Sequence, residues 1–263
     1  MKFKSIWFVS AILLFIFVPL KIVSFYQNLE IANTGWFTAL FLILLFIIPL
    51  LAGFEKLNME NIQVRKNIPL GIVSLLVAAS FAWCIPTYYF DTTQYDLEWQ
   101  PLIMGLLSLL TCIAFIMMAI TFFLGRNLFS KASFFVFCPV FWFAFDMILF
   151  LSMQNSSVNV YNIALTSFLA LFFLYYTQVF STSSKLNIVK LMVGLGVPAV
   201  LLAIPRWIIA FINVMSNQTN GMSDAELSTC GMEAVVSIYI ILVMVDICNQ
   251  IKENSSLEVG HGV

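Results

Sequence analysis

One apolar stretch that contains an arginine constrains the fold more than any other part of the chain. Residues Leu191 to Asn213 are mostly apolar and numerous enough to cross a bilayer as a helix. Arg206 lies inside this run, where an arginine costs roughly 2.5–3.5 kcal/mol on insertion scales. Such a residue usually faces the protein interior and finds a carboxylate partner there. The stretch therefore predicts further membrane helices packed around it.

The composition indicates how many such helices the chain can hold. Hydrophobic residues make up 62% of the sequence and charged residues 10%, whereas a soluble domain has about 25% charged residues. The net charge of −1 gives no indication of nucleic-acid binding. With 263 residues and about 20 residues per span, the chain has room for about eight spans and for no soluble catalytic domain. We therefore expect an all-α, polytopic transmembrane helix bundle.

Apolar runs of suitable length define the expected spans. The first run could be a signal peptide, but no small-x-small cleavage site follows it, so we interpret it as an uncleaved first span. A single transmembrane domain is expected over residues 1–250, followed by a short, disordered cytoplasmic tail over 251–263. The spans are expected at residues 5–26, 34–54, 68–90, 101–124, 132–153, 161–180, 189–213 and 232–248.

The positions of lysine and arginine between these spans predict the orientation of the chain. Lys2, Lys4, Lys56, Arg65, Lys66, Arg126, Lys131, Lys185 and Lys252 fall before span one or after an even-numbered span. The alternate loops, residues 27–33, 91–100, 154–160 and 214–231, contain neither residue type. The first, second and fourth of these loops hold acidic residues instead. Under the positive-inside rule, both termini are cytoplasmic. We expect a multi-pass protein of the bacterial plasma membrane.

Three charged residues fall inside or at the edge of the predicted spans. At 1.5 Å per residue, Asp146 lies about 18 Å and Arg206 about 22 Å from the cytoplasmic ends of spans that run in the same direction. Glu233 opens the last span near the same level. We expect Asp146 to pair with Arg206, with Glu233 as a second partner or rim residue. These three residues are the candidate substrate-binding site.

The cluster allows two interpretations. In the functional one, it forms an outward-facing polar pocket in which Arg206 holds an anionic group or Asp146 takes a proton or a cation. In the structural one, it is an ion pair that fixes the register of the helices. Both interpretations stay open at the level of sequence.

Two other features favour structural explanations. Asp246 and Gln250 end the last span, on roughly the same helix face as Tyr239 and Val243, and Asp246 is close enough to the interface to be solvated. Gly194 and Gly196 lie in the same span as Pro198 and Pro205. Such residues can unwind a helix around a ligand, but small residues more often allow close helix packing.

Several kinds of chemistry are not indicated. The one histidine, His261, lies in the tail, and no metal site, cofactor site or catalytic set is apparent. Lys21 and Lys190 lie at span boundaries, which argues against a retinal-binding lysine. We expect a non-enzymatic protein in contact with the lipid bilayer, with no nucleic-acid partner.

Three functions remain in order of preference. The first is a small permease that binds a small molecule or ion around Arg206. The second is a membrane subunit or receptor that docks an ATPase, a kinase or another membrane protein through residues 55–67 and the tail. The third, an intramembrane lipid-modifying enzyme, is weakest because no GxSxG elbow or matched aspartate pair is present.

Overall fold

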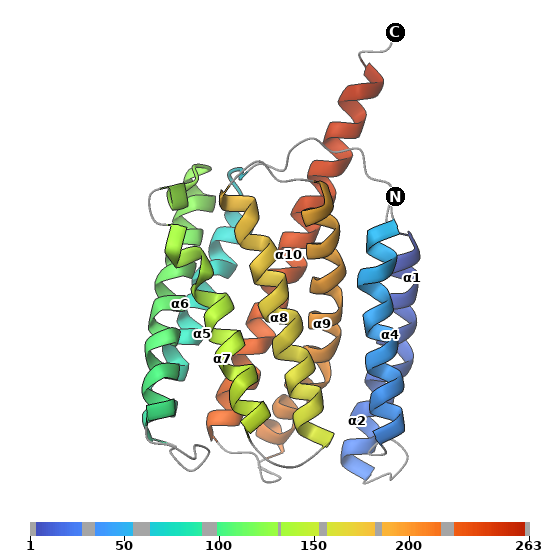
Figure 1. The fold of residues 1–263 in the computed structure, drawn as a ribbon, viewed down its shortest axis with the longest axis vertical. Coiled ribbons are helices and arrows are strands. Elements are labelled where there is room, and N and C mark those ends of the chain that lie inside the picture. The colour runs from blue at the N-terminus through green and yellow to red at the C-terminus, as the bar shows by residue number, and fades with distance from the viewer. Residues whose placement is uncertain are drawn as a thin grey trace.

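Long apolar helices lie side by side along one common direction in the computed structural model (Figure 1). The structure describes residues 4–27, 35–54, 64–90, 99–130, 133–152, 157–181, 186–216 and 224–260. Within these ranges all regular structure is helical, which confirms the all-α prediction. The elements are α1 (Lys4–Ile12), a π-helical segment (Leu13–Phe17), α2 (Val18–Gln27), α4 (Gly35–Phe54), α5 (Ile68–Phe90), α6 (Trp99–Leu124), two short 3₁₀ segments (Leu128–Ser130 and Ser133–Phe137), α7 (Cys138–Ser152), α8 (Ser157–Ser181), α9 (Leu186–Met215) and α10 (Asp224–Gly260).

Six helical segments in the described ranges are long and apolar enough to cross a membrane, so the chain is a multi-pass membrane protein. They agree with the last six predicted spans. Two shorter apolar stretches, Phe8–Val23 and Leu40–Ala52, lie inside the first two predicted spans. The six segments are Ile68–Tyr88, Trp99–Leu124, Phe134–Ser152, Val160–Phe180, Ile188–Met215 and Leu227–Ile251.

The helix boundaries differ from the predicted spans most at α10. Helix α5 covers the predicted residues 68–90 exactly as expected, whereas α10 begins at Asp224 and continues through Gly260. The helix therefore includes residues 251–260, for which the sequence predicts a disordered tail. Extending an existing helix adds one hydrogen bond per residue without a new nucleation cost, and no proline interrupts this segment. Figure 1 shows the end of α10 projecting beyond the other helices.

Helix α9 is the most enclosed of the six spanning segments, because 78% of the residues in its most apolar 18-residue stretch are buried. It packs against α4, α8 and α10. Its glycines allow close approach, because a Cβ atom added to Gly196 would lie 3.0 Å from both Ile240 and Phe172. This geometry agrees with the interpretation that the small residues of α9 allow close helix packing.

Aromatic side chains from α5, α6, α7 and α10 pack together in the core of the bundle. Trp142 and Phe81 meet edge to face, with ring centroids 5.2 Å apart, and Phe115 contacts Tyr239 in the same way at 5.3 Å. The indole Nε1 of Trp142 donates a hydrogen bond to the Ser108 hydroxyl at 2.7 Å. These aromatic side chains are fully buried.

Substitution of Gly194 tests the packing of α9 against α4. In Gly194→Ala the new Cβ would lie 2.8 Å from the Ala52 Cβ and 2.9 Å from the Pro49 Cα. Because one of these atoms belongs to the backbone of α4, we expect a loss of roughly 1–3 kcal/mol in unfolding free energy. Gly231→Ala is the matched control, since nothing lies within 4 Å of its added Cβ. Unfolding in mild detergent should show a loss for the first variant alone; equal effects would contradict this packing.

Candidate functional site

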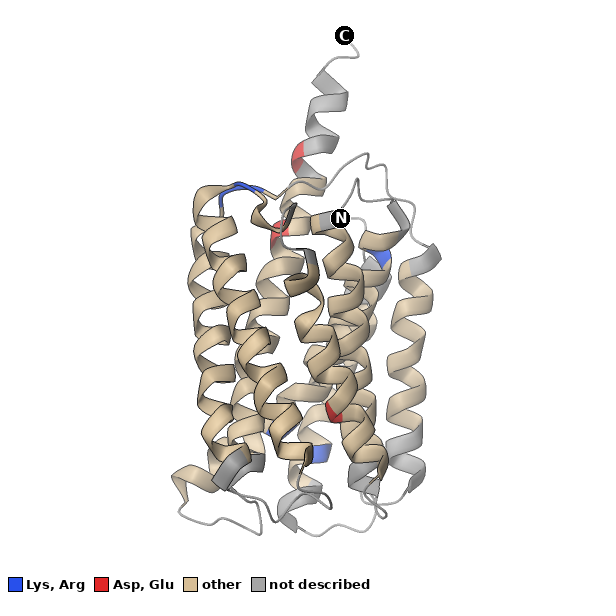
Figure 2. Cartoon of the chain, turned by 60° about the vertical axis from the view of Figure 1, so that its left-hand side comes forward, with Lys and Arg blue, Asp and Glu red and all other residues tan. Residues whose placement is uncertain are grey.

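Three membrane helices bring Asp146, Arg206 and Glu233 together, and we call these residues the charged cluster. Asp146 comes from α7, Arg206 from α9 and Glu233 from α10. Only 7% of Asp146 and 1% of Glu233 are exposed, and 11% of the Arg206 side chain. In Figure 2 the charged positions, blue and red, lie toward the two ends of the bundle, and the helices between them are tan. The charged cluster is therefore enclosed by protein.

Arg206 forms an ion pair with Glu233. The guanidinium Nη1 donates to Glu233 Oε1 at 2.6 Å. This differs from the expected pairing of Arg206 with Asp146. The hydroxyl of Ser237, one turn further along α10, donates to the backbone carbonyl of Glu233 at 2.7 Å. The pair thus connects α9 directly to α10.

Asp146 completes the cluster without a hydrogen bond at its Oδ2 atom. Among the residues that the structure describes, no donor reaches this buried oxygen. The charges of Glu233 and Arg206 both act on Asp146 electrostatically. With all three residues ionised, two carboxylates face one guanidinium, and the cluster has a net charge of −1.

Tyr161 supports the cluster from α8. Its hydroxyl donates to the backbone carbonyl of Leu202 in α9 at 2.6 Å, and its ring stacks on Phe41 of α4 with centroids 6.4 Å apart. The ammonium of Lys21 lies 5.7 Å from the centroid of the same ring. The charges of Arg206 and Glu233 also act electrostatically on the Tyr161 hydroxyl. The aromatic ring therefore links the N-terminal helices to the wall beside the charged cluster.

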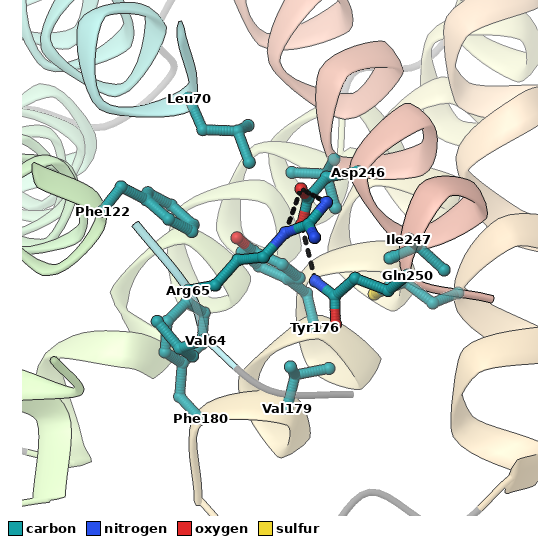
Figure 3. Close-up of a pocket in the computed structure, with 12 residues that line it drawn as sticks. Val64, Arg65, Leu70, Phe122, Tyr176, Val179, Phe180, Asp246, Ile247 and Gln250 are labelled. Carbon is teal, nitrogen blue, oxygen red and sulfur yellow. Dashed lines mark hydrogen bonds and ion pairs between the residues drawn. The ribbon is translucent and has the colours of Figure 1, made fainter. Parts of the chain in front are cut away.

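A second group of polar residues lies at the other end of the bundle, and we call it the inner latch. It consists of Arg65 and Asn67, which precede α5, and Asp246, Gln250 and Glu253 of α10. Asp246 Oδ1 accepts hydrogen bonds from Arg65 Nε at 3.1 Å, Arg65 Nη2 at 3.0 Å and Asn67 Nδ2 at 2.9 Å. Gln250 Nε2 donates to Asp246 Oδ2 at 2.7 Å, and Arg65 Nη1 donates to Glu253 at 2.8 Å. Figure 3 shows the contacts of Arg65 and Gln250 with Asp246.

The latch residues have further roles that hold them in place. The side-chain carbonyl of Asn67 accepts a hydrogen bond from the backbone N–H of Leu70 at 3.2 Å, which makes Asn67 the N-cap of α5. Partial burial alone lowers the pKa of the Arg65 guanidinium, but the hydrogen bonds and charges of Asp246 and Glu253 raise it overall. Arg65 therefore stays positively charged at physiological pH.

A small pocket lies next to the inner latch. Arg65, Asp246 and Gln250 line it together with apolar residues and Tyr176 (Figure 3). Its free volume of about 20 Å³ suffices for one or two water molecules and not for an organic substrate. The Tyr176 hydroxyl shares a hydrogen bond with the Tyr239 hydroxyl at 2.8 Å. This hydrogen bond joins Tyr176, a residue of the pocket wall, to the buried Tyr239 of α10.

The inner latch is the part of the site that sequence reasoning missed. Asp246 was expected to be solvated, whereas its side chain is only 11% exposed. It binds Arg65, which lies 181 residues earlier in the chain. The available indication was the spacing of Asp246 and Gln250, which places both on one helix face. Nothing in the sequence identified Arg65 as their partner among the several lysine and arginine residues of the loops.

Comparison with known proteins adds no assignment to this geometry. The described ranges contain no group of three or more His, Cys, Asp or Glu side chains placed to hold a metal ion. The chain matches no protein-family model, no curated protein and no solved structure.

Proposed function

We propose that this protein is a small permease of the bacterial plasma membrane, with eight spans and both termini in the cytoplasm. In this proposal the charged cluster lies in the outer half of the membrane and binds a proton or a monovalent cation that is coupled to substrate movement. The distribution of lysine and arginine supports this orientation. It also agrees with Figure 1, where the first turn of α1 and the last turn of α10 lie at the same end of the bundle.

The observation that carries the proposal is the buried Oδ2 of Asp146, which accepts no hydrogen bond from the described residues. A structural ion pair needs one carboxylate for one arginine, and Glu233 already fills that role at 2.6 Å. An additional buried carboxylate has a large desolvation cost unless its charge is compensated. Binding one proton or one monovalent cation at Asp146 makes the charged cluster neutral.

This charge balance suits a coupled carrier. When a buried site is neutral only with its ion bound, the free-energy cost of changing conformation is lower for the ion-bound protein than for the empty protein. Because Arg206 balances the charge of Glu233 in their ion pair, we assign the unbalanced charge of the cluster to Asp146. Ionisable residues inside membrane helices are commonly parts of ion or proton pathways.

Ion flux in proteoliposomes tests the proposal. Vesicles with the purified protein are loaded with a proton-sensitive or a sodium-sensitive dye, and a pooled small-molecule extract of bacterial cells is added outside. We expect extract-dependent entry of one of the two ions, faster than in protein-free vesicles. Equal rates with and without the protein, for both ions, would contradict a coupled permease.

A second candidate is a membrane subunit that docks a protein partner, and the length of α10 favours it. The helix continues through Gly260, past the end of its membrane-spanning segment at Ile251. In this candidate function the extension serves as a cytoplasmic contact surface together with residues 55–67, of which 55–63 lie outside the described residues. Purification in mild detergent followed by mass spectrometry separates the two functions. A stoichiometric protein partner would favour the subunit, whereas a bound small molecule without a partner would favour the permease.

A further inference from the structure

Near each end of the bundle, an acidic residue of helix α10 pairs with an arginine from another part of the chain. Glu233 pairs with Arg206 of α9, and Asp246 pairs with Arg65 of the segment before α5. The two carboxylates are thirteen residues apart, which corresponds to about 20 Å along the helix axis. The same helix therefore takes part in the charged contacts at both ends of the bundle.

The space between these two contacts is closed by buried aromatic side chains. Tyr239 lies on α10 between Glu233 and Asp246, is fully buried, and meets Phe115 and Tyr176 edge to face. Its hydroxyl also lies 3.5 Å from the Met118 sulfur. A permease needs a conformation in which the interior reaches the cytoplasm, and in this structure the inner latch lies where such an opening would form.

The latch is suited to reversible opening because it consists only of side-chain contacts across two segments. Arg65 and Asn67 supply three donors to one oxygen of Asp246, and charge-assisted hydrogen bonds of this kind are strong and directional. The Arg65 side chain is 36% exposed, so water can replace Asp246 as its partner. The pocket beside it is already lined by Tyr176 and Val243, which lie further inside the bundle.

We propose that the inner latch is the cytoplasmic gate of the permease, a proposal that rests on the function proposed above. Separation of Arg65 from Asp246 releases α10 from the segment Val64–Asn67 and opens the pocket to cytoplasmic water. Tyr176 and Tyr239 then become the first polar groups that an ion meets on its way between the pocket and the interior.

Thiol labelling from the cytoplasmic face tests this gate. Val243 lines the pocket next to the inner latch and is 3% exposed, so Val243→Cys places a buried thiol in the wall of this pocket. Inside-out vesicles are treated with a membrane-impermeant maleimide, and mass spectrometry of peptides measures the labelling rate at position 243. Arg65→Gln should raise this rate on the order of tenfold by increasing the open population. Lys66→Gln, which changes the exposed neighbouring cation, should leave the rate unchanged.

The same samples contain the controls that make the result decisive. Cys230 is fully buried and lies near Glu233 at the opposite end of α10, so its labelling reports loss of the fold. The exchange Arg65→Asp with Asp246→Arg should return position 243 to slow labelling. Equal rates in Arg65→Gln and Lys66→Gln would overturn the gate, as would a parallel rise at Cys230.

The labelling result is independent of the flux result. Labelling needs no substrate and no ion gradient. Faster labelling in Arg65→Gln without any ion flux would therefore show that the inner latch opens, but it would contradict the proposed permease function. Ion flux together with an unchanged labelling rate would support the permease function and contradict the proposal that the inner latch is its gate.

Discussion

Replacing Arg206 by glutamine is expected to lower the free energy of unfolding by roughly 3–5 kcal/mol, the range for breaking one side of a buried ion pair. The substitution leaves Glu233 as a carboxylate that is 1% exposed, with Asp146 beside it. Two like charges then share an enclosed site without a cation. Unfolding of the purified protein in mild detergent, with titration of a denaturing detergent, measures the loss. Arg126→Gln, at an exposed position just after α6, is the matched control and should leave the midpoint unchanged.

A pair of double-mutant cycles then identifies the partner of Arg206. Because the guanidinium lies 2.6 Å from Glu233, Glu233→Gln in the Arg206→Gln background should recover most of the lost stability. Asp146→Asn in the same background should recover less. A larger coupling for Asp146 than for Glu233 would favour the pairing expected from the sequence over the pairing in the structure.

Replacing Asp146 by asparagine is expected to reduce the extract-dependent ion flux to the level of protein-free vesicles. Asparagine keeps the shape of the side chain but cannot bind a proton or compensate a cation. The unfolding free energy should stay unchanged or rise, because an uncompensated buried charge has been removed. A loss of transport without a loss of stability separates a role in function from a role in folding.

The matched control for this substitution is Asp224→Asn. Asp224 is the first residue of α10 and lies before its membrane-spanning segment, which begins at Leu227. This variant makes the same chemical change outside the charged cluster and should leave the flux unchanged. If Asp146→Asn transported ions as fast as Asp224→Asn, Asp146 would have no part in coupling.

The spans could be predicted from the sequence because length and apolar character are local properties. Helix α5 begins where the polar residues Arg65, Lys66 and Asn67 end, and Pro69 occupies a first-turn position where its missing N–H has no cost. Helix α10 was predicted less well. Its apolar run ends near Cys248, but the helix continues because residues 249–260 propagate an existing helix at little cost.

The membership of the charged cluster could also be predicted, whereas its pairing could not. Counting residues along the predicted spans gives the depth of Asp146, Arg206 and Glu233, and in the structure all three lie together. Depth does not give the direction in which each helix faces. That direction depends on how α7, α9 and α10 pack, and it places Glu233 rather than Asp146 against the guanidinium. For the same reason the sequence did not predict the contact between Arg65 and Asp246, which joins residues 181 positions apart.

The most direct test of the central claim is infrared difference spectroscopy of Asp146 in the reconstituted protein. Spectra of the wild type minus Asp146→Asn are recorded at neutral pH in sodium-free buffer and again after addition of sodium. We predict either a carbonyl band of a protonated carboxylic acid in sodium-free buffer or a carboxylate band that shifts when sodium is added. An ionised carboxylate that does not respond to sodium would show that Asp146 binds neither a proton nor this cation, and it would contradict the coupling site.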